Sequence, residues 1–210
     1  MKKIIDSEIL ICPECGSGKI AIDQNMASCD NCCKKYPKIN GKFIFLNLGD
    51  EKLNDPLDKI KYLLKRFSKY YNFLIYLISP VYVGAQIKKF IKNYVSGRDY
   101  LAINLGSGNS VVSDEFVNID MFNYENVDLV CDIEKLPFKK ESVDAVLNIA
   151  VLEHVPNPEK VVDEINRVLK KNGLVCCFFP FIQGYHASPF DFSRRTYEGM
   201  KAPCVRIVVA

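Results

Sequence analysis

Residues 101–120 read LAINLGSGNSVVSDEFVNID, in which a short apolar run leads into a glycine turn and a second apolar run ends in an acid. The pattern predicts a buried strand up to Leu105, a tight turn at Gly106–Asn109 and a second strand up to Asp120. A glycine turn after a buried strand leaves backbone N–H groups open to a ligand. The sequence therefore predicts a binding site at the carboxyl edge of a sheet.

Three more apolar runs follow in the sequence: VDLVC at 127–131, VDAVLNIAV at 143–151 and GLVCCFFPF at 173–181. Between the last two, Pro158–Lys171 has the apolar spacing of an amphipathic helix, and Gly173 suits the position after its last turn. Strands that alternate with helices are typical of a sheet covered on both faces. We predict an α/β fold with a Rossmann-like, mainly parallel sheet and flanking helices.

Acidic residues end two of these strands. Asp120 ends the second strand and Asp132 follows the third, so both are expected at the same sheet edge as the glycine turn. One carboxylate can accept hydrogen bonds from a ribose diol and the other from an exocyclic adenine amine, which predicts an adenosine site. The dinucleotide fingerprint G-x-G-x-x-G would need glycine where the chain has Val111, so a nicotinamide cofactor is disfavoured.

Cysteines cluster near the N-terminus, where CPEC at 12–15 and CDNC at 29–32 are two C-x-x-C pairs separated by 13 residues. This spacing is typical of a four-thiolate zinc site. Cys33 is the spare cysteine, because the C-x-x-C register favours its neighbour. A head this short cannot bury a sufficient core, and a bound metal would supply the missing folding free energy. We predict a structural zinc ion held by Cys12, Cys15, Cys29 and Cys32.

Composition excludes several classes of protein. Of the 210 residues, 49% are hydrophobic and 25% are charged, so wholesale disorder is excluded. The net charge of +3 is too small to imply a nucleic-acid or membrane partner. The start of the chain has no apolar run and cleavage site of a secretory signal, and a cytoplasmic location with reduced cysteines is expected.

Three zones are expected along the chain: a zinc-ribbon-like domain at 1–48, a helical connector or lid at 49–99, and a ligand-binding core at 100–210. The connector shows helical spacing twice, first up to Pro80 and then from Ile87 to Gly97. The apolar run Phe73–Ala85 has 13 residues, too few for a transmembrane helix, which takes about 20. We interpret this run as part of a lid, with a membrane-surface segment as the alternative.

The motifs INLGSG, VNID, DLVCDIEKLPF, SVDAVLNIAVLEHV and INRVLKKNGLV resemble the successive motifs of class I S-adenosylmethionine-dependent methyltransferases of type 11, over residues 101–181. The head, with Tyr36–Pro37 after its second C-x-x-C pair, resembles the zinc ribbons that accompany some of these enzymes. The resemblance implies S-adenosylmethionine as cofactor. It implies contacts to the methionine part from Asn104, Gly106, Ser107 and Gly108, to the ribose from Asp120, to the adenine from Met121, Asp132 and Ile133, and a floor under the sulfonium from Asn148.

The chain departs from the commoner family pattern in two places. Asn104 stands where an acid usually precedes the first glycine, and only nine residues, 107–115, separate that glycine from the second strand. A shortened crossover occurs in a subset of the family whose downstream motif is similar to GYHASPFDFSRRT at 184–196. In that loop His186 and Asp191 are the candidate catalytic residues, because a neutral imidazole is the usual base near neutral pH. His154 is interpreted more readily as a capping residue.

The end of the chain leaves room for at most one strand after residue 200, where the family usually adds two antiparallel strands. The sheet is therefore expected to be minimal, or the sequence to be a fragment. The function expected from the resemblance is methyl transfer to a small-molecule, sugar or lipid-linked acceptor. The alternatives are an RNA methyltransferase that uses the ribbon to bind its substrate, and an inactive module that binds cofactor or, through the ribbon, a partner protein.

Overall fold

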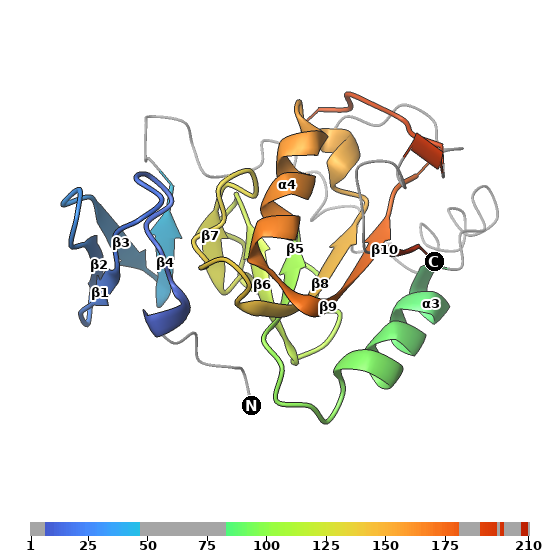
Figure 1. Ribbon diagram of the computed structural model, residues 1–210, viewed down its shortest axis with the longest axis horizontal. Coiled ribbons are helices and arrows are strands. Elements are labelled where there is room, and N and C mark those ends of the chain that lie inside the picture. The colour runs from blue at the N-terminus through green and yellow to red at the C-terminus, as the bar shows by residue number, and fades with distance from the viewer. Residues whose placement is uncertain (1–6, 47–82, 181–189, 197, 200–206, 210) are drawn as a thin grey trace.

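The computed structural model of the chain describes residues 7–46, 83–180, 190–196, 198–199 and 207–209. Its strands form one sheet in the order β1-β2-β3-β4-β7-β6-β5-β8-β9-β10 (Figure 1). The four strands of the head are β1 (Ile20–Ile22), β2 (Met26–Cys29), β3 (Lys35–Ile39) and β4 (Lys42–Phe45). The others are β5 (Ala102–Leu105), β6 (Phe116–Asp120), β7 (Leu129–Cys131), β8 (Val143–Ile149), β9 (Leu169–Phe178) and β10 (Ile207–Val209).

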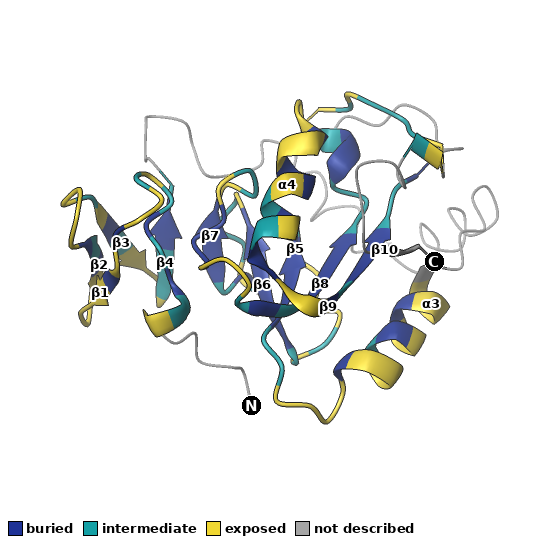
Figure 2. Ribbon diagram, viewed as in Figure 1, coloured by how far each residue is buried: buried dark blue, intermediate teal, exposed yellow. Residues whose placement is uncertain are grey.

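The strands from β7 to β10 pair in parallel, as the alternating sequence predicts. Every residue of β5, β6 and β7 is buried, which is the environment expected for continuous apolar runs in a covered parallel sheet (Figure 2). The mainly parallel, Rossmann-like sheet is confirmed. Strand β6 matches its apolar run, β5 and β7 begin one and two residues later than theirs, and β8 ends two residues earlier. Strand β9 begins four residues before the predicted run and ends three residues before its end.

Helices pack on the two faces of this sheet. The helix α4 (Pro158–Val168) buries Val161 and Ile165 in the same apolar cluster as Ile103, which points to one face of β5. The helix α3 (Val83–Phe90) and the π-helical turn η2 (Ile91–Val95) pack against Ala102, the next residue along β5. Because successive strand residues point to opposite faces, the two helices cover opposite faces of the sheet. In Figure 1, α4 lies in front of the strands, and α3 lies at the end of the sheet that is farther from strands β1 to β4.

The predicted helix at Pro158–Lys171 is wrong at its end, because α4 stops at Val168 and strand β9 begins at Leu169. The apolar spacing continues through both residues, so the sequence pattern alone does not separate them. Leu169 pairs with Val143 of β8, and this pairing ends the helix. Gly173 lies inside the strand and does not cap the helix: a Cβ atom there would lie 2.7 Å from the Leu169 side chain.

Two connections in the core agree with the short spacing in the sequence. Residues 106–115 run from β5 to β6 without a helix. After β9, the only further strand among the described residues is β10, which pairs with β9 in parallel through Ile207 and Val175. No antiparallel strand follows β9 in the described part of the chain.

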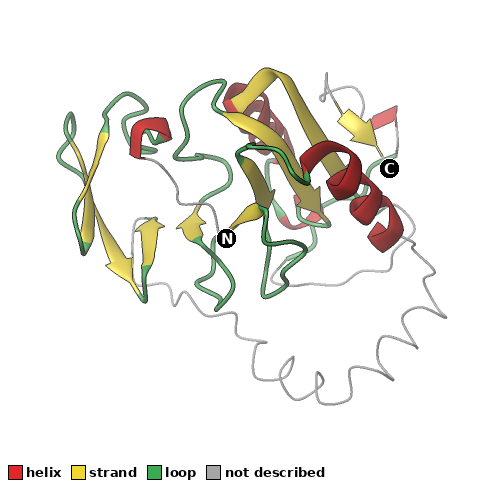
Figure 3. Ribbon diagram, turned by 90° about the horizontal axis from the view of Figure 1, so that it is seen from below, coloured by secondary structure: helices red, strands yellow, loops and turns green. Residues whose placement is uncertain are grey.

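The head continues the sheet of the core. The strands β1, β2, β3 and β4 pair with their neighbours antiparallel, and β4 then pairs in parallel with β7, with Phe43 opposite Leu129 and Phe45 opposite Cys131. Figure 3 shows the head strands at one end of the molecule, beside the strands of the core. The two parts therefore share one hydrogen-bonded sheet.

Several expectations fall outside the described residues. These are the first helix of the connector, most of the run Phe73–Ala85 apart from its last residues in α3, and His186. The predicted second connector helix is confirmed by α3 and η2, and the chain turns away at Gly97, whose φ is 73°. Within the described residues, no helix has the length and apolarity needed to cross a membrane.

Candidate functional site

The glycine turn after β5 has the backbone geometry that the sequence predicts. Gly106 has a φ of 65°, and a Cβ atom on it would lie 2.4 Å from a methyl carbon of Val151. Any side chain here would collide with the turn that follows β8, so glycine is required. The Gly108 N–H donates to Asp120 Oδ2 at 2.8 Å, which ties the turn to the end of β6.

The two predicted carboxylates are held by backbone N–H groups of their own loops. Asp120 also accepts from the N–H of Phe122 at 2.9 Å, and Asp132 accepts from the N–H of Glu134 at 2.8 Å. Each carboxylate oxygen has two lone pairs, so both residues keep acceptor capacity for a ligand. Asp120 is buried and Asp132 is exposed. The arrangement fixes two acceptors at neighbouring strand ends, as an adenosine site requires.

A cavity of about 560 Å³ opens at this edge of the sheet. Its size lies within the range of about 300–1,000 Å³ that small-molecule sites occupy. Six of the nine predicted cofactor-binding residues line it: Gly106, Gly108, Asp120, Met121, Asp132 and Ile133. His154, which the sequence suggests as a capping residue, also lines the cavity. Residues that the sequence did not single out complete the wall, namely Leu46, Phe122, Tyr124, Glu134, Ala150, Val151, Val155, Pro156, Phe190 and Phe192.

The other three predicted residues lie below the cavity wall. Ser107 and Asn104 are buried, and Asn104 Nδ2 donates to Asn118 Oδ1 at 3.1 Å. Asn148 is fully buried, its Oδ1 lies 3.7 Å from Cys177 Sγ, and its Nδ2 has no hydrogen-bond partner among the described residues. These side chains support the turn and the end of β8 and do not line the cavity.

The chain leaves β8 through a strained residue. Ala150 has a φ of 53°, a left-handed conformation that costs an alanine about 1 kcal/mol or more, and it lines the cavity. Its N–H donates to the carbonyl of Phe178 at 2.9 Å, which holds the turn in place. Strained backbone of this kind clusters at binding sites.

Of the two predicted catalytic residues, only Asp191 belongs to the described part of the chain. His186 lies outside the described residues. The Asp191 carboxylate pairs with the guanidinium of Arg194 through both oxygens, at 2.7 Å for Oδ2, and is only 4% exposed. This hydrogen bond raises the pKa of Arg194. Asp191 therefore shapes its loop by holding Arg194.

His154 lies in the cavity wall and contacts the same loop. Its Nδ1 is hydrogen-bonded to the carbonyl oxygen of Phe190, and its Nε2 lies 3.8 Å from Oε1 of the buried Glu153. The Phe192 N–H donates to the Glu153 carbonyl at 2.7 Å. These contacts bring the exposed Phe190 and Phe192 to the cavity mouth. Because 36 residues separate His154 from Phe190 in the chain, no local sequence pattern indicates this contact.

The four predicted cysteines come together in the head, with their sulfur atoms all within 4.8 Å of one another. The sulfur atoms of Cys12 and Cys32 are 3.6 Å apart, and those of Cys15 and Cys29 are 3.7 Å apart. Cys33 is not in the cluster and has a φ of 57°, which turns the chain after Cys32. The sequence reasoning on the C-x-x-C register is confirmed.

The cluster has the environment of a cation site. Backbone hydrogen bonds from Ser17 and Gly18 lower the pKa of Cys15 to about 5. A backbone hydrogen bond from Lys34 lowers the pKa of Cys32, but burial and the three neighbouring cysteines outweigh it and raise the value to about 12. Four sulfur atoms at this distance can all be thiolates only around a cation, and four thiolates suit tetrahedral Zn²⁺. Gly18 leaves the space, since a Cβ there would lie 2.1 Å from Cys29 Sγ.

Comparison with known proteins agrees with the expectation for the core. Residues 94–177 match the methyltransferase domain family of type 11, which confirms the resemblance seen in the sequence for that segment. An uncharacterized protein of Methanocaldococcus jannaschii is 32% identical over 100 residues. That alignment covers 42% of this chain and 44% of the relative, so the chain matches less than half of the relative's length.

Solved structures with partial likeness include the MccD protein, with a TM-score of 0.44 and 18% identity over 56% of this chain and 67% of that one. A protein of Methanococcus maripaludis, provisionally named as an S-adenosyl-L-methionine-dependent methyltransferase, has a TM-score of 0.41 and 16% identity over 61% and 64% of the chains. The YcgJ protein of Bacillus subtilis has a TM-score of 0.38 and 21% identity over 42% and 47%.

Proposed function

We propose that this chain is an S-adenosylmethionine-dependent methyltransferase. The observation that carries the proposal is that the glycine turn and the two strand-end carboxylates line the same cavity. All of these residues belong to the segment that matches the methyltransferase domain family. Acceptors at the ends of two neighbouring parallel strands suit an adenosine, and the bare backbone at Gly106–Gly108 suits the amino-acid part of the cofactor.

The residues have separate binding roles in this proposal. Asp120 accepts hydrogen bonds from the ribose hydroxyls, Asp132 and the backbone of Ile133 contact the adenine edge, and Met121 packs on the adenine face. The buried Asn148 amide, which lacks a hydrogen-bond partner among the described residues, provides polar support under the reacting centre. The cofactor, when bound, supplies a methyl group activated on a sulfonium. The protein contributes alignment of that group with the acceptor and exclusion of water.

The proposed acceptor is a small molecule, a sugar or a lipid-linked compound. The aromatic side chains Phe122, Tyr124, Phe190 and Phe192 line the cavity, and the last two are 60% and 51% exposed at its mouth. Such a wall favours an acceptor with an apolar or aromatic body. An RNA acceptor is the second candidate, although the net charge of +3 does not favour RNA binding. Binding of an RNA acceptor would weaken steeply as the salt concentration rises.

His186 and Asp191 are the two residues that we propose to assist methyl transfer. His186 is the proposed base where the acceptor must lose a proton, as an imidazole titrates near neutral pH. Asp191 is proposed as a positioning residue, because its carboxylate is committed to Arg194. If the base assignment is right, the His186→Gln variant loses the low-pH limb of the kcat profile and keeps cofactor binding.

The head is proposed to hold one structural zinc ion on Cys12, Cys15, Cys29 and Cys32. The Tyr36 hydroxyl lies 3.0 Å from Cys12 Sγ and donates a hydrogen bond to the thiolate. Burial raises the pKa of Tyr36, so this donor keeps its proton. Every position around the ion is then filled by sulfur, which is the pattern of a structural and not a catalytic site.

Calorimetric titration of the zinc-loaded protein with S-adenosylmethionine tests the proposal. We expect one site per chain. Truncation of Asp120 or Asp132 to alanine should weaken binding about 10- to 100-fold, since a hydrogen bond to a charged group contributes about 1.5–3 kcal/mol. Asp163→Ala, on the exposed face of α4, is the matched control. Absence of binding by a folded, zinc-loaded chain would contradict the proposal and favour an inactive module.

A further inference from the structure

We propose that the four-cysteine head is a structural part of the cofactor site, so that metal binding in the head and cofactor binding in the core strengthen each other. This inference rests on the proposed function for the identity of the cofactor. It assigns to the head a positioning role for the adenine end of the cavity, through Lys42, Tyr36 and strand β4, in place of a separate substrate-binding role.

The first link is the strand junction. Strand β7 has only three residues, Leu129–Cys131, and Asp132 of the cavity follows it directly. On one side β7 pairs with β6, and on the other side all three of its residues pair with β4 of the head. Without β4, β7 would be a three-residue edge strand, and short edge strands open readily. The position of Asp132 thus depends on a strand that the head supplies.

The second link is Lys42, at the start of β4. Its Nζ donates to the carbonyl oxygen of Tyr124 and, at 2.8 Å, to that of Glu125. These carbonyls belong to the segment 121–127, which follows Asp120 and places Phe122 and Tyr124 in the cavity wall. A lysine of the head therefore holds the loop on which the ribose and adenine would rest. The positive charge makes both hydrogen bonds stronger than bonds between neutral groups.

The third link is apolar packing of β4 on both of its faces. Ile44 is buried in one cluster with Val127 and Val130, and Tyr124 packs against this cluster. Phe45 belongs to the main core, which also contains Cys131. Leu46, the residue after β4, lines the cavity itself. The side of the cavity that contains Asp132 is therefore formed partly by the head.

The fourth link connects the metal site to β4. The Tyr36 hydroxyl contacts Cys12 Sγ at 3.0 Å, and the Tyr36 ring lies 4.7 Å, centroid to centroid, from the ring of Phe45. A smaller cavity of about 220 Å³ between head and core is lined by both rings and by Leu46 and Asp132. Only one tyrosine side chain thus separates a metal ligand from the strand that supports Asp132.

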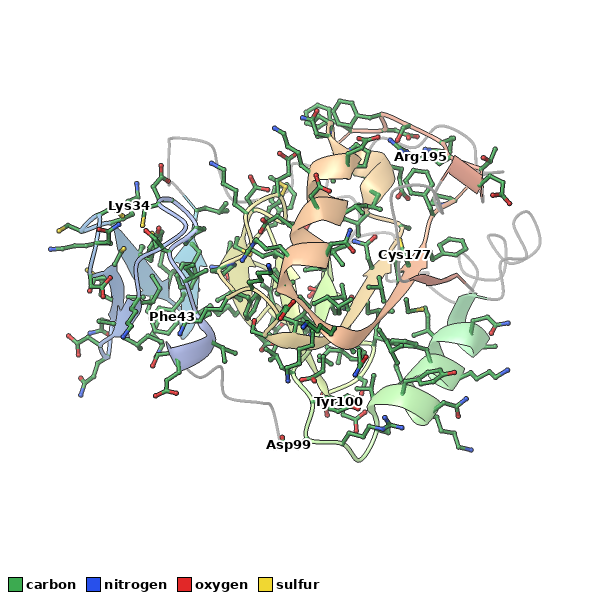
Figure 4. All side chains as sticks on the ribbon, in the orientation of Figure 1. Lys34, Phe43, Asp99, Tyr100, Cys177 and Arg195 are labelled. Atoms are coloured by element: carbon green, nitrogen blue, oxygen red, sulfur yellow. The ribbon has the colours of Figure 1, made fainter. Side chains whose placement is uncertain are left out.

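The fifth link is the segment before Cys12. Leu10 is buried and bridges to Phe138, the Ile11 N–H donates to the Pro137 carbonyl at 3.1 Å, and the Lys139 N–H donates to the Ile9 carbonyl at 2.9 Å. The head is therefore attached to the core on both sides of Asp132. Figure 4 labels Phe43 in the head and Arg195 on the other side of the core.

The physical consequence is thermodynamic coupling. A head of this size depends on its metal to fold. Loss of the metal should release β4 and Lys42, which would loosen β7 and the segment 121–127. A ligand that needs those segments ordered binds more weakly to the loosened protein, and by linkage the cofactor must strengthen metal binding by the same factor.

The experiment uses the full chain in four forms: zinc-loaded, zinc-stripped with a chelator, zinc-loaded Lys42→Met, and zinc-loaded Lys35→Met. Lys35 is an exposed lysine on the neighbouring strand β3 and is the matched control. Hydrogen exchange of the amides at 121–132 is measured without cofactor. Titration with S-adenosylmethionine and chelator competition for zinc, with and without cofactor, follow.

We expect faster exchange at 121–132 and about tenfold weaker cofactor binding on zinc removal, within the usual range of coupling between sites. Lys42→Met should keep its zinc and still exchange faster and bind cofactor more weakly, whereas Lys35→Met should match the wild type. The Lys42→Met arm remains decisive if the stripped protein unfolds. Unchanged exchange and affinity in Lys42→Met would overturn the inference. Failure of the zinc-loaded wild type to bind cofactor would instead overturn the proposed function, and the exchange measurement would still test the role of the head.

Discussion

The head and the core are parts of one sheet, but they are stabilised in different ways. Strands β5, β6 and β7 are buried at every position, whereas β1 buries only Ile20 and β2 only Ala27 and Cys29. Figure 2 shows the same contrast, with dark core strands and a largely exposed outer head. The core can fold by burying apolar surface, and the zinc ion that we propose for the four-cysteine cluster would add stability to the head. The comparison teaches that two regions of one sheet can share an apolar cluster and still differ in how much of each strand is buried.

The largest expected effect comes from removing a metal ligand. Cys29→Ser should abolish zinc binding, because the buried sulfur of Cys29 is one of the four in the cluster and accepts the N–H groups of Asn31 and Cys32 at 3.4 Å. Structural zinc contributes about 10–16 kcal/mol of apparent binding free energy in small domains. We expect loss of bound zinc and of amide protection at Ile20–Cys29, measured by metal analysis and hydrogen exchange.

The neighbouring cysteine supplies the control for that variant. Cys33 is exposed and lies outside the cluster, so Cys33→Ser should keep one zinc ion per chain and the protection of the head. Loss of zinc from Cys33→Ser, or its full retention in Cys29→Ser, would contradict the ligand set and would remove the basis for contrasting the two regions.

A substitution in the core tests the other half of the comparison. Leu147 is fully buried in the middle of β8, so Leu147→Ala should lower the free energy of unfolding by about 2–5 kcal/mol through lost burial and a residual cavity. Zinc content should not change. Urea denaturation gives the free energy, and Leu147→Met, which conserves volume, should cost less than about 1.5 kcal/mol. Equal losses in the two variants would argue against tight packing at this position.

The smallest expected effect concerns the surface of the core. A hydrogen bond from the Arg195 guanidinium lowers the pKa of Glu159, and the pair joins the loop after residue 190 to the first turn of α4. Because the folded-state pKa lies below the unfolded value of about 4.3, the pair stabilises the fold above that value and loses its effect as the pH falls through the lowered pKa. Glu159→Gln should therefore lower the Tm slightly at pH 7 and have no effect at pH 2. Thermal melts at the two pH values test this, and an equal Tm difference at both would refute the role of the ion pair.

Sequence reasoning succeeded where the signal is local. The C-x-x-C register identified the four cluster cysteines and excluded Cys33, because the spacing within a turn dictates which sulfur atoms can converge. The core strands were found because a strand that is buried on both faces must be apolar throughout. The carboxylates at positions 120 and 132 were found because strand ends meet at one edge of the sheet.

Sequence reasoning failed where the local structure depends on residues that are distant in the chain. The helical spacing up to Leu169 conceals the start of β9, because a buried strand and a buried helix turn use the same apolar residues, and pairing with β8 decides between them. The contributions of Leu46 and Phe190 to the cavity were missed for a similar reason, since they come from segments far along the chain from the glycine turn.

The sequence by itself determined the parallel core, the glycine turn with its two acids and the four-cysteine cluster, because each depends on spacing within a few residues or on uniform burial. Only the tertiary structure established that β4 pairs with β7 and that Lys42 holds the loop carrying Tyr124. Strand pairing across some 85 residues leaves no periodic trace in the sequence, as any short apolar strand can form the same backbone hydrogen bonds and only the packed fold selects its neighbour.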